Sequence, residues 1–394
     1  MPDSKLAEEH LRILTKVPHM AGTIEDKATA DYVAQKFRSA GLDTQIVEYK
    51  VWMNYPAEIR VDLTAPAGIE MHGPTRERVD NDPYQDDPRV VMPFNGMSPS
   101  GDAEADVVYA NYGTPEDFEK LDKLKVDVRG KIVLVRYGQN FRGVKVFVAQ
   151  EHGAAGVIIY SDPADDGWRR GDKYPEGPWR PDTGVQRGSV GYMFEFPGDP
   201  TTPGVASVPS LPASQRVSPQ QSAQMPKIPV TPLSYHDVWP VLQHLSGPDS
   251  PREWQGALPF TYHVGPGPAK LKMHLKQDYQ FRTLWDVIGR VRTLDNGGAV
   301  DTSNLKVRLP EPDGSWSTTV VNGPIELATL FATDPVAERC YLTQWLAFAL
   351  AARAGELPAL DASAFAAFAA SGFNLKEGIV AVLSSDAFLT PAPH

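Results

Sequence analysis

The strongest fold signal in the sequence is a buried strand, a helix and a second buried strand in close succession. GKIVLVRYG (130–138) and GVIIY (156–160) are short apolar runs bounded by glycine. Between them, the apolar residues of RGVKVFVAQEHG (142–153) fall on one face of a helix that we expect to end at Gly153. A strand, helix, strand unit of this size predicts an α/β architecture.

Two helices and a strand are predicted before this unit. Residues 4–17 carry leucines near one helical face, with Ser4 as the expected N-cap. A second helix is expected from Thr23 to Gly41, where a threonine caps the start and a glycine follows the end. TQIVEYKV (44–51) alternates apolar and polar residues and predicts a half-buried strand.

The second half of the chain changes character twice. Residues 162–268 are rich in Pro, Gly and Asp, and we expect long ordered loops with short strands there. KLKMHLK (270–276) alternates cleanly and leads into LWDVIGRV, which predicts another strand. Asp313-Gly314 indicates a hairpin turn. Capping patterns then predict a small helical domain after residue 334, with helices at about 335–353, 361–371 and 374–383.

Length and composition indicate a globular chain. The 394 residues, 42% hydrophobic and 22% charged, suit two or three domains. No apolar run is long enough for a membrane span. The net charge of −11 opposes a phosphate-binding surface, so we expect no nucleic-acid partner. MPDSKLAEEH does not resemble a signal peptide, which leaves a cytoplasmic location and an already removed leader both open.

The sequence contains no recognisable metal or nucleophile motif. Its nine histidines are scattered and none lies in an HExxH motif. SDPADD (161–166) could bind a cation, but a loop cap after a strand is the favoured interpretation. Ser189 lacks the spacing of a nucleophile elbow, and Cys340, the single cysteine, lies in an apolar segment that suits an inert thiol.

Arg142 is a candidate for binding a carboxylate. It stands at the start of a predicted helix, where an exposed guanidinium can hold a carboxylate through two hydrogen bonds. An ordinary surface arginine is the alternative, and spacing alone favours it.

Residues 1 to about 291 resemble the N-terminal part of zinc metallopeptidases of the glutamate carboxypeptidase II group, which also contains the transferrin receptor. The resemblance rests on VPHMAGT, GLDTQIVEYKVWMNYP, GKIVLVRYGQNFRGVKV, GAAGVIIYSDPADD, GVQRG, GDPTTPG and KLKMHL. It implies a partial peptidase α/β scaffold with an inserted β-rich protease-associated (PA) domain. The implied boundaries are a scaffold segment at 1–54, the PA domain at 55–268, return strands at 269–291 and a separate C-terminal domain at 292–394.

The same resemblance implies roles for four residues. Arg142 matches an arginine that helps to hold the substrate carboxylate, and Ser189 stands where the group has an asparagine. Thr202 and Val205 match backbone positions that help to hold a structural calcium ion. The zinc ligands and the catalytic glutamate of the group follow the return strand, and this chain has no counterpart of them. We therefore expect no catalytic residue and neither zinc nor calcium in this chain.

Residues from about 285 to 390 resemble a second family, a C-terminal domain of unknown function from exported, cytochrome-c-associated proteins of planctomycete type. The matching stretches are IGRVRTLDNGGAVDTS, NGPIELATLFATDP, CYLTQWLAFAL and SGFNLKEGIVAVLSSDAF. WDVIGR suits both families, which favours recombination or an artefact of gene assembly at residues 285–300.

Three hypotheses follow from these resemblances. The favoured one is a non-catalytic module that binds a peptide or protein through its PA domain. The second is an active zinc-dependent exopeptidase, and the third is a chimeric gene product without an evolved function. The resemblance favours a periplasmic or secreted location. We expect a monomer, because the group dimerises mainly through a domain that has no counterpart here.

Overall fold

The computed structural model describes residues 3–79, 81–290, 305–310 and 316–321, together with Ala366 and Ala370. The chain divides into two compact units, Met1–Val291 and Arg292–His394. The helices predicted at 335–353 and 374–383, and with them Cys340, lie outside the described residues. Within the helix predicted at 361–371, only Ala366 and Ala370 are described, and both are helical.

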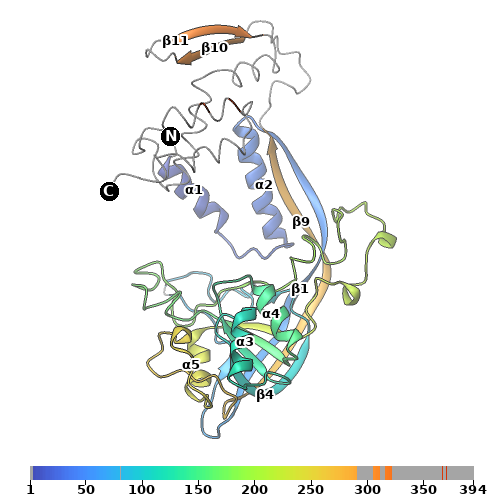
Figure 1. Ribbon diagram of the computed structural model, residues 1–394. Coiled ribbons are helices and arrows are strands. Elements are labelled where there is room, and N and C mark those ends of the chain that lie inside the picture. Colours follow the sequence, from blue (N-terminus) through green and yellow to red (C-terminus); the bar gives the residue numbers. More distant parts are fainter. Residues whose placement is uncertain are drawn as a thin grey trace. The chain divides into compact units, whose positions relative to one another are not determined.

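A seven-stranded mixed sheet forms the centre of the first unit (Figure 1). Its strand order is β2-β1-β9-β4-β5-β6-β8. The strands from β4 onward in this order are parallel to one another, whereas β1, β2 and β9 pair antiparallel. The bounds are β1 (Asp43–Ala65), β2 (His72–Gly73), β4 (Gly101–Tyr109), β5 (Ile132–Arg136), β6 (Gly156–Tyr160), β8 (Val230–Leu233) and β9 (Lys270–Arg290).

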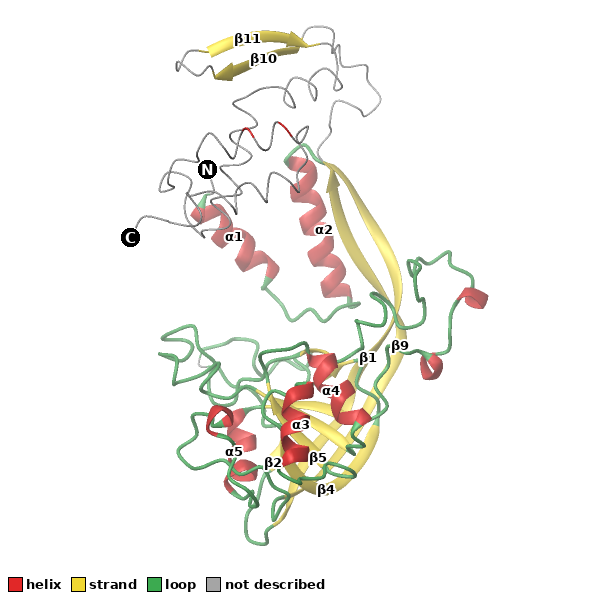
Figure 2. Ribbon diagram, in the orientation of Figure 1, coloured by secondary structure: helices red, strands yellow, loops and turns green. Residues whose placement is uncertain are grey.

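Helices flank the parallel part of the sheet (Figure 2). They are α3 (Pro115–Lys123), α4 (Arg142–Glu151) and α5 (Tyr235–Gln243). Every residue of β5 and β6 is buried, as expected for parallel strands that are covered on both faces. Short 3-10 turns at Ala213–Gln215, Pro219–Gln221 and Arg252–Trp254 lie in the loops, and β3 (Asn95–Gly96) pairs in parallel with β7 (Gly188–Ser189).

The strands β1 and β9 form one long antiparallel pair. Its register runs from Asp43 opposite Arg290 to Ala65 opposite Lys270. Helix α2 (Ile24–Ser39) packs against both strands, and α1 (Ser4–Leu14) precedes it. The second unit contains an antiparallel pair of β10 (Leu305–Pro310) and β11 (Trp316–Val321), as the predicted hairpin requires. The predicted turn residues Asp313 and Gly314 lie outside the described residues.

The expected fold class is confirmed for the described residues, with three local corrections. Asp3, not Ser4, caps α1, because its carboxylate accepts hydrogen bonds from the backbone N–H groups of Lys5 and Leu6. The same helix ends at Leu14, before the predicted end at residue 17. Helix α5 lies in the region that we expected to contain only loops and short strands.

Candidate functional site

Helix α4 begins with Arg142, and this arginine lies against β7. Its Nε donates to the carbonyl oxygen of Ser189 at 3.1 Å. The Ser189 hydroxyl accepts from the N–H of Gly191 at 3.1 Å, so it stabilises the turn that follows β7. The structure thus brings together the two residues that the sequence proposed as a substrate-binding pair.

Glycines make this close packing possible. A Cβ atom on Gly143 would lie 2.4 Å from the carbonyl oxygen of Gly191, and one on Gly188 would lie 2.3 Å from Cζ of Arg142. The guanidinium therefore rests directly on the backbone of β7. Only glycine allows this approach at both positions.

Arg142 differs from its arginine neighbours in its charge pairing. Burial raises the pKa of Tyr137, while the charges of Arg142, Arg180 and Arg187 act in the opposite direction, so all three arginines lie near this phenol. Arg180 pairs with Asp166 and Arg187 pairs with Glu77. Within the described residues, Arg142 has no carboxylate partner, and neither of its Nη atoms makes a hydrogen bond. The two Nη atoms of Arg142 are therefore without an acceptor in that part of the chain.

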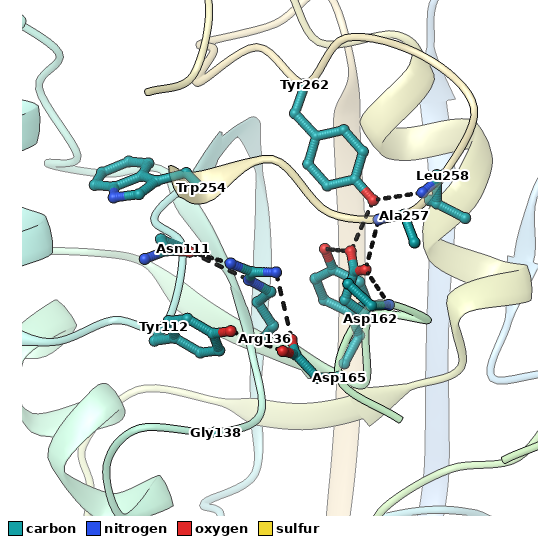
Figure 3. Close-up of polar contacts among 12 residues, drawn as sticks. Asn111, Tyr112, Arg136, Gly138, Asp162, Asp165, Trp254, Ala257, Leu258 and Tyr262 are labelled. Carbon is teal, nitrogen blue, oxygen red and sulfur yellow. Dashed lines mark hydrogen bonds and ion pairs between the residues drawn. The ribbon is translucent and has the colours of Figure 1, made fainter. Parts of the chain in front are cut away.

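A buried polar network lies at the carboxyl ends of β5 and β6 (Figure 3). The Asp162 carboxylate, fully buried, accepts hydrogen bonds from the hydroxyls of Tyr160 and Tyr262 at 2.9 and 2.7 Å. It also accepts from the N–H groups of Ala164 and Ala257, both at 2.9 Å. The interpretation of SDPADD as a loop cap is therefore confirmed.

The adjoining half of the network surrounds Arg136. This guanidinium lies over the ring of Tyr112 at 4.2 Å and donates to Asn111 Oδ1 at 2.7 Å and Asp165 Oδ2 at 3.3 Å. Burial raises the pKa of Tyr112 to about 12, so its hydroxyl stays protonated and donates to Asp165 at 2.8 Å. Arg136 and Asp165 thus pair with each other, and the network holds the surrounding loops in place.

Of the two carbonyls that the resemblance linked to calcium, that of Thr202 has a protein partner. The Thr202 carbonyl accepts the N–H of Val205 at 3.2 Å. Asp199, the carboxylate next to Thr202, accepts from Arg216 Nη1 at 3.2 Å and from three hydroxyls, those of Thr201, Thr202 and Ser207. An arginine and three hydroxyls thus occupy the Asp199 carboxylate, which disfavours a cation on that group.

The described residues also do not fit a zinc centre. Zinc in proteins needs three or more His, Cys, Asp or Glu side chains that converge on one point. No such group occurs among the residues that the structure describes. In that same part of the chain, no helix is long and apolar enough to cross a membrane.

Comparisons with known proteins identify two domains. Residues 97–191 match the PA domain family, and residues 317–388 match a family described as "Protein of unknown function (DUF1585)". The PA match contains the Arg142 and Ser189 pair. A PA domain is a type of domain that takes part in protein interactions.

Curated relatives resemble the larger part of the chain. A "Probable glutamate carboxypeptidase" of Arthroderma benhamiae is 40% identical over 298 residues, which cover 73% of this chain and 40% of that protein. "Aminopeptidase NAALADL1" of Rattus norvegicus is 34% identical over 276 residues, which cover 67% of this chain and 36% of that protein. This chain therefore spans well under half the length of the relatives that it matches.

Among solved structures, an aminopeptidase from Aneurinibacillus sp. strain AM-1 matches with a TM-score of 0.35 and 15% identity, covering 73% of this chain and 47% of that one.

The chain is a composite. It joins a glutamate carboxypeptidase II-like segment with a PA domain to a DUF1585 segment.

Proposed function

We propose that this chain is a non-catalytic binding module that holds a peptide carboxylate at Arg142 of its PA domain. The observation that carries the proposal is the pairing of the arginines near Tyr137: two are neutralised by carboxylates, whereas Arg142 has no such partner among the described residues. Its Nε is fixed by the Ser189 carbonyl, which leaves the two Nη atoms for a ligand.

The geometry suits a carboxylate better than other ligands. A guanidinium forms two parallel hydrogen bonds with a carboxylate, and each such charge-assisted bond contributes roughly 1.5 to 3 kcal/mol. Because Nε already donates to Ser189, the pair of Nη atoms remains for this contact. Peptides that end in an acidic residue carry two carboxylates near their end and are the natural first ligands to test.

The proposal of a binding module also depends on whether the described residues could hold a catalytic zinc ion. Hydrolysis by zinc requires ligands that place the ion beside the scissile bond. The described residues contain no such group. We therefore propose that the described unit binds its ligand without cleaving it.

An active zinc-dependent exopeptidase is the second candidate function. The names of the relatives, a glutamate carboxypeptidase and an aminopeptidase, favour it. Zinc content separates the two candidates, because an active enzyme would carry stoichiometric metal and lose its activity with a chelator.

Titration calorimetry with a dipeptide that ends in glutamate tests the binding proposal. We expect Arg142→Ala to weaken binding by about 10-fold to 100-fold, through the loss of a bidentate contact. Arg142→Lys should restore only part of the affinity, because an ammonium group lacks the planar pair of donors.

Arg129→Ala is the matched control, because Arg129 is an exposed arginine that pairs with Asp127. The Arg129→Ala variant should bind the dipeptide with the same affinity as the unmodified chain. Equal affinities of the Arg142→Ala variant and the unmodified chain would refute the assignment of the carboxylate to Arg142.

A further inference from the structure

A cavity lies elsewhere in the first unit, between α5, the β1–β2 turn and the loop that follows β6. Its volume is about 660 Å³, and it shares no lining residue with the Arg142 pair. This volume is within the range of small-ligand sites. The cavity therefore has room for a long side chain together with part of its backbone.

The side chains that line this cavity carry carboxylates but no lysine or arginine. Its lining contains the carboxylates of Glu70, Asp182 and Asp237 and two histidines, but no lysine or arginine. Asp237 is saturated by Thr75 and Ser234. Asp182 accepts the Tyr235 hydroxyl at 2.6 Å and pairs with Lys173. Glu70 makes no ion pair with any residue that the structure describes, so its charge is available to a ligand.

Two tryptophans line the same cavity. Trp168 is 41% exposed. Trp239 stands on α5, where an edge-to-face contact with Phe260, at 6.0 Å between ring centroids, holds its ring. The faces of indole rings attract cations more strongly than those of other aromatic side chains. Carboxylates and indoles in one cavity without a lysine or arginine favour a cationic ligand.

We propose that this cavity binds the basic side chain of an arginine or lysine residue from a peptide or protein partner. Glu70 pairs with the cation, and Trp168 and Trp239 cover its apolar stem and its charged end. The Tyr235 and Asp182 pair forms the wall of the cavity. Long basic side chains combine an aliphatic stem with a charged end, which matches this mixture of apolar and acidic surface.

Ligand-detected NMR with the full chain tests the proposal, with N-acetyl-arginine methylamide and N-acetyl-lysine methylamide as probes. We expect saturable binding of at least one probe, and binding should weaken as salt is raised. The citrulline analogue, which has nearly the shape of arginine but no charge, should bind at least several-fold more weakly. A citrulline analogue that binds as well as arginine, or basic probes that show no saturable binding, would overturn the proposal.

Variants locate the binding within the cavity. Glu70→Gln and Trp168→Ala should each weaken binding by about 2-fold to 30-fold, the range expected for a cation contact with a carboxylate or an indole. Trp168→Phe should retain part of the affinity. Glu104→Gln, on β4, removes a carboxylate that does not line the cavity and serves as the control. Unchanged binding in both the Glu70→Gln and Trp168→Ala variants would exclude this cavity as the site.

Discussion

At the scale of single residues, the molecule separates charges that are satisfied from charges that are free. Asp162 and Arg136 are buried and have partners on several sides. Arg142 and Glu70 make no ion pair with the described residues, and Glu70 lines a cavity. Asp162 and Arg136 hold the structure in place, whereas Arg142 and Glu70 define the two proposed sites.

Asp162→Ala should destabilise the first unit strongly. The substitution leaves two backbone N–H groups and two tyrosine hydroxyls without their acceptor. Buried donors without a partner cost about 1 to 3 kcal/mol each, so we expect a loss of about 3 kcal/mol or more in the free energy of unfolding. Urea denaturation followed by circular dichroism measures this loss. Asp127→Ala, an exposed control, should change stability by less than about 0.5 kcal/mol.

Lys145 should make stability depend on pH. It is fully buried, and this burial lowers the pKa of its ammonium from the ordinary 10.5 to about 7. Between these two values the unfolded chain binds one more proton than the folded chain, so the free energy of unfolding should increase as the pH rises from 7.

The slope due to Lys145 should approach about 1.4 kcal/mol per pH unit between pH 7 and 9. It should disappear in Lys145→Met. Urea titrations of both proteins across this range measure the difference. Parallel stability curves would contradict the expectation and would mean that the acceptors of Lys145, the Tyr112 and Gly138 carbonyls and the Asn140 side chain, keep the ammonium charged.

At the scale of elements, the close contact of α4 with β7 positions Arg142. Gly143→Ala should push these elements apart, because the added methyl group would lie 2.4 Å from the Gly191 carbonyl oxygen. We expect a loss of about 1 to 3 kcal/mol in stability and a weaker affinity for the glutamate dipeptide. Gly96→Ala, on the neighbouring strand β3, meets nothing closer than 3.6 Å and is the matched control. Equal stability and affinity in the two variants would show that the close approach does not position Arg142.

The elements differ in how well the sequence predicts them. β9 was predictable, because Leu271, Met273 and Leu275 alternate with polar residues and all three are buried. α3 was missed although Thr114 and Asp117 form a capping box that the sequence displays. α5 was missed because Pro240 lies inside the helix and Pro-rich segments surround it.

β1 extends beyond the predicted strand at 44–51. A bulge between Pro56 and Glu58 lets it continue to Ala65, past the proposed boundary at residue 54. This continuation depends on pairing with β9, which lies far away in the sequence, so local alternation could not reveal it.

The candidate sites were also predictable only in part from the sequence. Arg142 and Ser189 came from the resemblance, and the structure places them in contact. The pairing of the neighbouring arginines was not predictable, because Arg180 pairs with Asp166 14 residues away and Arg187 with Glu77 110 residues away. The cavity with Glu70 and Trp168 is assembled from several separate segments and has no local sequence signature.

At the scale of the whole molecule, a glutamate carboxypeptidase II-like segment is joined to a DUF1585 segment. We propose that residues 55–268 form the PA domain, which contains the observed match at 97–191. Limited proteolysis of the full chain should leave a protected core that includes these residues, because most of the buried apolar side chains belong to them. Mass spectrometry identifies the fragment, and early cleavage inside 97–191 would contradict the proposal.

Our central proposal is that the described unit binds a peptide carboxylate at Arg142 and does not cleave the peptide. One NMR experiment follows a dipeptide ending in glutamate in the presence of the full chain and added zinc. We predict reversible broadening of the dipeptide signals, its loss in Arg142→Ala, and an intact dipeptide after prolonged incubation. Release of free glutamate that a chelator stops, or an absence of broadening with the unmodified chain, would contradict the claim.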